Sequence, residues 1–400
     1  MRSIELFTGA GGLALGLAGA GFQHLALVER DEHSCETLRE NQRRQVRDMS
    51  SWKISEQDIE QFDFASIPEN IELLAAGVPC QPFSIGGKHR GHEDDRNMFP
   101  ETVEAVRKLK PKAVLLENVR GLKRPSFAKY FGYIQLMVAY PEIRRRPKEE
   151  WFNHLSRLER YHTRGKPDGL YYRVVTQVLN AADYGVPQKR ERVFIVAFRN
   201  DLHLEWSFPS CTHSQDALIW SQFITREYWD QHRVPKRLIP KQNGKLSLRI
   251  DRLRDGLLPF LQPWRTVRDA ISDLPQPAKR RSSDEPGLNH FQIPGARQYV
   301  GHTGSGWDEP AKTLKAGDHG VPGGENMLAE LDGSVRYFTI RESARLQTFP
   351  DEYVFPGSWT ESMRQIGNAV TTCGCRQGGL PQQLYSEWIQ QSRNARQHNG

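Results

Sequence analysis

The chain has few cysteines and no long apolar run, and these absences narrow its class. Five cysteines are scattered over 400 residues, an odd number that argues against a disulfide framework and fits a reducing compartment. The N-terminus, MRSIELFTGAGG, lacks the apolar stretch of a signal peptide, and no segment approaches the roughly 20 apolar residues of a membrane span. We therefore expect a cytoplasmic protein without membrane contact.

The sequence also gives little sign of a bound metal. Cys373 and Cys375 are the only cysteines close together, and a lone Cys-x-Cys pair without a second pair of ligands is a weak indication of zinc. We expect no metal site.

Positively charged residues are only slightly in excess of negatively charged ones. Lys and Arg outnumber Asp and Glu by 55 to 48, which gives a net charge of +7 and a pI near 9.1. Such an excess suits a polyanionic partner, but it is also common on ordinary soluble surfaces. Composition alone leaves a nucleic-acid partner open.

The rhythm of apolar runs predicts an α/β fold with two domains. Residues 1 to about 198 alternate apolar runs with amphipathic stretches, as in a sheet with helices between its strands. Residues 199–335 show no period, and a helical pattern returns at 341–347. We expect a larger domain from 1–198 plus 336–400 and a smaller, irregular one from 199–335. The apolar runs lie at 4–7, 25–28, 71–77, 113–118 and 193–198.

A polar and basic segment lies between residues 140 and 166. It includes Arg144-Arg145-Arg146 and Lys148. A solvated helix or loop is the plainer interpretation, and an arm that contacts phosphates is the alternative.

A glycine-rich turn follows the first apolar run. Residues 7–12, Phe-Thr-Gly-Ala-Gly-Gly, connect a predicted strand to a predicted helix. Glycines there let a ligand approach the backbone, and a helix N-terminus offers unpaired N–H groups to an anion. The alternative is a tight turn with nothing bound.

Two acidic positions follow at spacings that suit an adenosine ligand. Glu29 ends the second apolar run, where such folds use an acid to bind ribose hydroxyls. Asp58-Ile59 comes later and would place a carboxylate at an adenine amino group. Each acid has the alternative of an ordinary surface carboxylate.

Cys80 stands in a loop framed by prolines. The segment 77–84, Gly-Val-Pro-Cys-Gln-Pro-Phe-Ser, directly follows a buried-strand pattern, and the flanking prolines would hold the sulfur in place. An isolated cysteine is more often a small buried hydrophobe than a nucleophile. The Pro-Cys-Gln-Pro setting favours the nucleophile.

Charged residues at two further strand ends complete the candidate centre. Glu117 ends an apolar run, where a partly buried carboxylate is costly unless it is paired or working. Before the run at 193–198, alternation directs Gln188, Arg190 and Arg192 to one face of a strand. The alternative for these three is a solvated strand end.

With these blocks in this order, the chain resembles the bacterial cytosine-5 DNA methyltransferase family from its first residues to about Val370. The matching blocks are FTGAGG, Glu29, Asp58-Ile59, GVPCQPFS, Asp95-Arg96-Asn97-Met98-Phe99, ENV at 117–119, QKRER at 188–192, RESARLQTFP at 341–350, and Gln365-Ile366-Gly367-Asn368-Ala369-Val370.

The resemblance implies a Rossmann-like methyltransferase sheet with S-adenosyl-L-methionine as methyl donor. It also implies that the last helical segment returns to the first domain and helps to close the donor pocket. The residues implied around the donor are Phe7, Thr8, Gly9, Gly11, Gly12, Glu29, Arg30, Asp58, Ile59, Pro79, Met98, Asn368 and Val370.

The family's chemistry assigns roles to the residues at the strand ends. Cytosine C5 is a poor nucleophile, so a thiolate, implied to be that of Cys80, must first add to C6. Glu117 would neutralise the ring at N3, which needs a carboxyl with a raised pKa, and Arg192 would bind O2. Gln188 shares this face, and Arg190 would support the thiolate and its loop. The base that removes the C5 proton is not identified.

The implied substrate is double-stranded DNA with the target cytosine flipped out of the stack. The predicted DNA contacts are Ser84, Lys88 and Arg90 in the catalytic loop and Thr313 and Leu314 in the smaller domain. The implied setting is a restriction-modification system, with a restriction endonuclease as a functional but not a physical partner. We expect a monomer.

Two alternatives stay open. One is an enzyme that methylates cytosine in transfer RNA, as a relative of this family does. The other is a DNA-binding protein of this fold that has lost activity. It is favoured by residues 371–379, Thr-Thr-Cys-Gly-Cys-Arg-Gln-Gly-Gly, which replace the proline and apolar helix that usually follow in the family.

Overall fold

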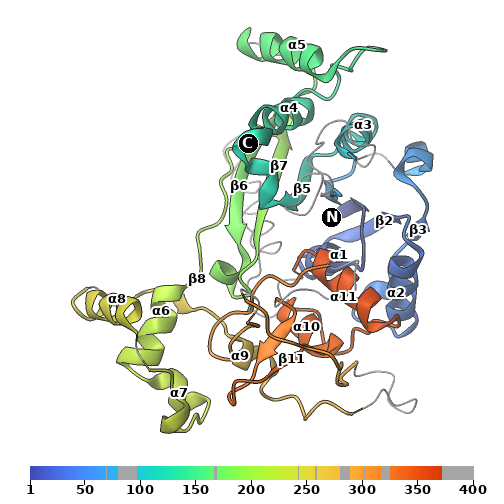
Figure 1. Ribbon diagram of the computed structural model, residues 1–400. Coiled ribbons are helices and arrows are strands. Elements are labelled where there is room, and N and C mark those ends of the chain that lie inside the picture. Colours follow the sequence, from blue (N-terminus) through green and yellow to red (C-terminus); the bar gives the residue numbers. More distant parts are fainter. Residues whose placement is uncertain are drawn as a thin grey trace, which may run out of the picture. The chain divides into compact units, whose positions relative to one another are not determined.

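The computed structural model describes residues 1–68, 70–79, 97–165, 169–241, 243–256, 259–279, 289–300, 303–316 and 325–371. Its described residues fall into two compact units (Figure 1). The first consists of Met1–Leu179 and Glu191–Pro209, and the second of Asn180–Arg190 and the described residues from Ser210 onward. The predicted division into 1–198 plus 336–400 and 199–335 concerns functional domains and stays a prediction.

The first unit is built on a seven-stranded sheet in the order β3-β2-β1-β4-β5-β7-β6. Parallel pairs join β3, β2, β1, β4 and β5, and β7 runs antiparallel to β5. The order reverses between β1 and β4, and ligands of α/β sheets bind beyond the carboxyl ends of strands at such a point. The strands are β1 Arg2–Leu6, β2 Gln23–Glu29, β3 Ile54–Glu56, β4 Leu73–Gly77, β5 Ala113–Val119, β6 Tyr172–Asn180 and β7 Glu191–Arg199.

Five α-helices in the described residues of the first unit accompany this sheet (Figure 1). They are α1 Gly12–Gly19, α2 Glu32–Arg43, α3 Phe99–Leu109, α4 Ala128–Ala139 and α5 Trp151–Thr163. The helix α3 begins with a proline in its first turn and ends with Arg107 and Lys108, an arrangement that suits the helix dipole. The prediction of an α/β fold is confirmed.

The main core of the first unit covers one face of the sheet. Ile4 and Leu6 of β1 join Leu74 of β4 and Leu116 of β5 in it, packed against apolar residues of α3 and α4. Strand alternation turns Ser3 and Glu5 to the opposite face, where both are buried. The core therefore fixes the strands whose carboxyl ends carry the candidate residues.

The second unit has short elements. Its helices are α6 Gln215–Ile219, α7 Glu227–Gln231, α8 Gly244–Arg254, α9 Val267–Ile271, α10 Ile340–Leu346 and α11 Trp359–Asn368. Strands β8 His213–Ser214 and β9 Gln262–Pro263 form a parallel pair, and β10 Met327–Ala329 and β11 Val335–Tyr337 an antiparallel one. Thr339 and Glu342 form a capping box at the start of α10, where the sequence predicts a helix.

In the part of the chain that the structure describes, no helix is long and apolar enough to span a bilayer.

Candidate active site

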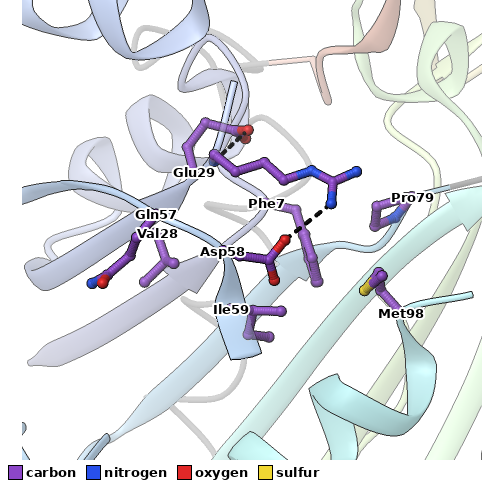
Figure 2. Close-up of a pocket in the computed structure, with 9 residues that line it drawn as sticks. Phe7, Val28, Glu29, Gln57, Asp58, Ile59, Pro79 and Met98 are labelled. Atoms are coloured by element: carbon purple, nitrogen blue, oxygen red, sulfur yellow. Dashed lines mark hydrogen bonds and ion pairs between the residues drawn. The ribbon is translucent and has the colours of Figure 1, made fainter. Parts of the chain in front are cut away.

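A pocket lies at the carboxyl edge of the sheet in the first unit (Figure 2). It is formed by residues that end β1 and β2, follow β3 and β4, and precede α3. The lining residues are Phe7, Val28, Glu29, Arg30, Gln57, Asp58, Ile59, Pro79 and Met98. Seven of these nine were predicted as donor contacts, whereas Val28 and Gln57 were not.

The glycine-rich turn bends sharply beside this pocket. Phe7, Gly9 and Gly11 have φ values of 55°, 55° and 76°, in the left-handed region that favours glycine. A Cβ on Gly9 would meet no atom within 4 Å, so its backbone borders open space. Gly11 precedes the first residue of α1, so the turn delivers the chain into the helix as predicted.

Glu29 holds the turn through main-chain hydrogen bonds. Its Oε2 accepts from the N–H of Gly9 at 2.7 Å, and its Oε1 accepts from the N–H groups of Arg30 and Asp31 at 2.9 and 2.8 Å. A carboxylate has about four acceptor positions, so these bonds leave capacity for a ligand hydroxyl. The acid that ends β2 therefore shapes the turn and faces the pocket.

Asp58 lies on the other side of the pocket as an ionised acceptor. A hydrogen bond from the main chain of Glu60, together with the Arg30 guanidinium 3.0 Å away, lowers the pKa of the Asp58 carboxyl. The dashed line that ends at Asp58 in Figure 2 marks this ion pair. The acceptor is thus held in place at neutral pH, as binding of an amino group requires.

Apolar side chains supply the rest of the lining. Ile59 is 5% exposed and belongs to the core, and Phe7 and Met98 pack against that core. Figure 2 shows Phe7, Ile59 and Met98 around the space beside Asp58. Apolar walls with a few fixed polar groups are typical of a small-molecule site and suit a purine ring.

Glu117 and Arg192 form a buried ion pair at the end of β5. Arg192 Nε lies 3.0 Å from Glu117 Oε1, and the two side chains are 16% and 8% exposed. The register explains the contact, because Val119 of β5 pairs with Arg192 of β7 and Glu117 with Phe194. The structure thus joins two residues that the sequence predicted separately.

The end of β5 is also paired with and hydrogen-bonded to the segment that leads to Cys80. Glu117 pairs with Gly77 of β4, and the Asn118 side-chain amide donates to the Val78 carbonyl at 3.1 Å. Pro79, the residue before Cys80, lines the pocket. Cys80, Ser84, Lys88 and Arg90 lie outside the described residues, so their placement stays a prediction.

Gln188 and Arg190 belong to the second unit, where both are buried and bound to main chain. Arg190 donates to the carbonyls of Leu314, Gly367 and Ala369 at 3.3, 2.9 and 2.8 Å. Gln188 Oε1 accepts from the Leu314 N–H at 3.1 Å. These bonds fit a positioning role, and the predicted contact of Arg190 with the thiolate stays a prediction.

Thr313 and Leu314 are held in the same part of the second unit. Thr313 Oγ1 donates to the Lys189 carbonyl at 2.6 Å, and Leu314 is 1% exposed. These contacts hold the segment around Thr313 and Leu314 in place, while its contact with DNA stays a prediction. Asn368 and Val370 also belong to the second unit, and their place beside the donor stays a prediction.

Four of the predicted methyl-donor contacts, Thr8, Gly9, Gly11 and Gly12, form the turn but are not among the residues that line the pocket. Thr8 is buried, and its N–H donates to the Val28 carbonyl at 3.3 Å. Gly11 and Gly12 lie at the start of α1 and are also buried. Their role in the described structure is to shape the turn.

Glu5 is a buried carboxyl that the sequence did not mark. It lies on the sheet face opposite the main core, and burial raises the pKa of the Glu5 carboxyl well above its ordinary value. Glu29 nearby acts in the same direction, and the main chain of Ala14 opposes both. Its place within an apolar strand pattern was the only available signal.

Among the described residues, no group of three His, Cys, Asp or Glu side chains is arranged to hold a metal ion.

Comparison with known proteins agrees with this geometry. The family model described as C-5 cytosine-specific DNA methylase matches residues 1–137 and 165–376. The Type II methyltransferase M.Eco47II of Escherichia coli is 32% identical over 370 residues, covering 92% of this chain and 75% of its own length. M.NgoMIV of Neisseria gonorrhoeae is 31% identical over 367 residues and covers 92% of both chains.

Solved structures agree at the level of fold. The Entamoeba histolytica methyltransferase EhMeth matches with a TM-score of 0.51 at 14% identity, covering 97% of this chain and 98% of its own. The Dnmt2 methyltransferase of S. pombe has a TM-score of 0.50 at 15% identity, with the same coverages of 97% and 98%.

Proposed function

The chain belongs to the C-5 cytosine-specific DNA methylase family, and from that premise we propose that Cys80, Glu117 and Arg192 act on the flipped-out base. The reaction is the transfer of the methyl group of S-adenosylmethionine to carbon 5 of cytosine in DNA. The predicted family, cofactor and enzyme class are therefore confirmed.

The donor fits the pocket at the carboxyl edge of the first unit. Asp58 presents an ionised acceptor for the adenine amino group, and Glu29 presents one for the ribose hydroxyls. Phe7, Ile59 and Met98 offer apolar surface to the purine. Bound S-adenosylmethionine would supply an electrophilic methyl group, and the residues lining the pocket would hold its adenosine part.

The chain's own residues prepare the cytosine. The Cys80 thiolate forms a bond to C6, the electrons of the C5–C6 double bond move toward C5, and a proton held between Glu117 and N3 neutralises the ring. Arg192 donates to O2, the exocyclic oxygen on C2, which lies on the same edge of the base as N3. Once C5 carries the methyl group, loss of the C5 proton re-forms the double bond and expels Cys80.

The observation that carries this proposal is the ion pair at the end of β5. N3 and O2 are both bonded to C2 and lie on the same edge of the base, so an acid and a cation that recognise them must be held side by side, and Glu117 and Arg192 are. Their partial burial makes each hydrogen bond to the base stronger than it would be in water. Asn118 links this pair to the segment that leads to Cys80.

We propose a site-specific modification enzyme that acts on duplex DNA as a cytoplasmic monomer, with a restriction endonuclease of the same specificity as its functional partner. The relatives named Type II methyltransferases support this setting. The family match favours DNA over transfer RNA as the substrate.

Bisulfite sequencing of DNA from expressing cells tests the proposal. We expect conversion-resistant cytosines at one short motif, and none above background with a Cys80→Ala variant. Unmodified DNA from cells with folded wild-type protein would refute it, as would unchanged methylation by Cys80→Ala. Transfer RNA from the same cells serves as the comparison substrate.

A further inference from the structure

Residues 138–164 lie outside the match to the family model, and most of them form a structured segment rather than a solvated loop. They contain α5 and the residues that lead into it. We call residues 140–163 the α5 segment. Its amino acid sequence suggested a charged surface, but His154, Leu155 and Leu158 are buried.

Hydrogen bonds inside the α5 segment fix its shape. His154 Nε2 donates to the Ile143 carbonyl at 2.7 Å, which leaves Nδ1 to accept from the Tyr133 hydroxyl at 2.8 Å. Arg157 binds both oxygens of Glu149 at 2.7 and 2.8 Å and the Arg144 carbonyl at 2.6 Å. A segment anchored in this way can support its neighbours.

The α5 segment packs on α4 through aromatic rings. Trp151 meets Tyr130 edge to face, with ring centroids 5.4 Å apart, and lies 5.7 Å from Tyr133. Tyr133 also meets His154 edge to face at 5.5 Å. We call Tyr130, Tyr133, Trp151 and His154 the aromatic cluster. Figure 1 shows α5 beyond α4 in the first unit.

The α5 segment also contacts the far end of α3. Arg107 of α3 donates to the Pro141 carbonyl, and Arg144 pairs with Glu104 of α3 at 3.3 Å. The carboxyl-terminal half of α3 is therefore held directly by residues that the family model does not cover.

The aromatic cluster reaches the other end of α3 through one hydroxyl. Tyr130 is 5% exposed, and its hydroxyl accepts a hydrogen bond from the Asn97 side-chain amide. Asn97 directly precedes Met98, which lines the donor pocket and whose carbonyl accepts from the N–H and hydroxyl of Thr102 at 3.0 and 2.7 Å. Tyr130 is therefore hydrogen-bonded to the residue that directly precedes Met98, one of the residues lining the pocket.

We propose that Tyr130, supported by Trp151 of the α5 segment, is a positioning residue for the methyl donor that acts through Asn97 on Met98. With Asn97 held, the main chain enters α3 in one orientation and Met98 keeps its place opposite Asp58. This inference rests on the proposed donor pocket, and it gives the α5 segment a role in donor affinity rather than in DNA contact.

Calorimetric titration of the full chain with S-adenosylmethionine tests the proposal. Tyr130→Phe keeps the ring and removes the acceptor for Asn97, and we expect its Kd to rise about three- to tenfold, the range of one hydrogen bond. Trp151→Leu removes the ring that packs edge to face with Tyr130, and we expect it to raise the Kd as well. At saturating donor, kcat of Tyr130→Phe should stay near the wild-type value.

Matched variants separate positioning from general stability. Tyr172→Phe also removes a buried hydroxyl, which donates to the Pro111 carbonyl at 2.8 Å, and Phe152→Leu changes the 52%-exposed neighbour of Trp151. Both should keep the wild-type Kd even if Tm falls. Combining Asn97→Ala with Tyr130→Phe should weaken binding no more than Asn97→Ala alone, because Asn97→Ala already removes the bond to Tyr130 as well as the one that Asn97 accepts from the Phe99 N–H.

Two outcomes would overturn the inference. One is an unchanged Kd in folded Tyr130→Phe, and the other is an equal rise in Kd for Tyr130→Phe and Tyr172→Phe. Failure of the underlying pocket is recognised separately with Asp58→Asn. If that variant also binds the donor as the wild type does, the pocket is misassigned, whereas a weakened Asp58→Asn beside an unaffected Tyr130→Phe refutes only the positioning role.

Discussion

Besides Cys80, Glu117 is the side chain whose exact chemistry the proposed reaction needs. A Glu117→Gln variant keeps the size and can still accept from Arg192, but it cannot deliver a proton to N3. We expect kcat for methyl transfer to a duplex oligonucleotide to fall by about 10²- to 10⁴-fold. Radiolabelled methyl incorporation would measure this fall.

The matched measurement is donor affinity, because Glu117 does not line the pocket. Calorimetry should give the same Kd for S-adenosylmethionine in Glu117→Gln and wild type. Full activity of the variant would remove Glu117 from the proton-transfer role.

Gly367 carries a steric requirement. A Cβ there would lie 2.3 Å from Ala316 N and 2.5 Å from the Lys315 carbonyl carbon, so the backbone at 315–316 must move. We expect Gly367→Ala to destabilise the protein by about 1–3 kcal/mol, as overpacking does. Chemical denaturation would measure the loss.

Gly244→Ala provides the control for Gly367→Ala. Gly244 belongs to the same unit, and a Cβ there would meet no atom within 4 Å. Its stability should match or slightly exceed that of the wild type. If both alanine variants were equally stable, the close approach at Gly367 would be absent in solution.

His24 makes the packing of β1, β2 and α1 dependent on pH. Its Nε2 donates to the Ala14 carbonyl at 2.9 Å, its Nδ1 bonds to Ser3 Oγ at 2.9 Å, and burial lowers the pKa of His24 to about 4. The unfolded chain binds a proton below about 6.5 while the folded chain does not. The free energy of unfolding should therefore fall as the pH drops from about 6.5 to about 4.

Other groups also titrate in this pH range. The contribution of His24 is therefore measured as the difference in unfolding free energy between the wild type and a variant without the histidine. His24→Gln retains an amide donor for Ala14 and has no charge to gain. We expect the wild type to lose about 1.4 kcal/mol per pH unit more than this variant within the window. Urea denaturation at pH 5 and pH 6.5 measures this difference. If both proteins lost the same free energy of unfolding between these two pH values, the assignment to His24 would be contradicted.

The apolar runs predicted the central strands well because a buried strand needs continuous hydrophobicity. The runs at 4–7, 25–28, 71–77, 113–118 and 193–198 correspond to β1, β2, β4, β5 and β7. Within the seven-stranded sheet, the two strands without a predicted run are β3 and β6, which lie at its edges. Edge strands bury less surface, so their sequences carry less of the apolar signal.

Side-chain partnerships were beyond the sequence because they depend on register and on distant segments. Glu117 and Arg192 were each predicted at a strand end, yet their contact follows from the pairing of Val119 with Arg192. Arg190 was predicted on the same face, but its partners are carbonyls 124 to 179 residues away. No local pattern encodes such contacts.

The chain as a whole offers a test of how much of the donor site each unit provides. The described pocket lies entirely in the first unit, whereas Asn368 and Val370 of the second unit are predicted donor contacts from the family resemblance. Hydrogen exchange of the full chain with and without S-adenosylmethionine distinguishes these contributions. Peptides covering 7–12, 29–31, 57–60 and 97–99 should gain protection.

Protection at 365–371 is expected as well if Asn368 and Val370 contact the methyl donor, and peptides covering 244–254 of α8 serve as the reference that should not change. Donor-dependent protection in the first unit alone would remove Asn368 and Val370 from the site. Protection in both places would support Asn368 and Val370 as contacts of the methyl donor, the role that the family resemblance implies for them.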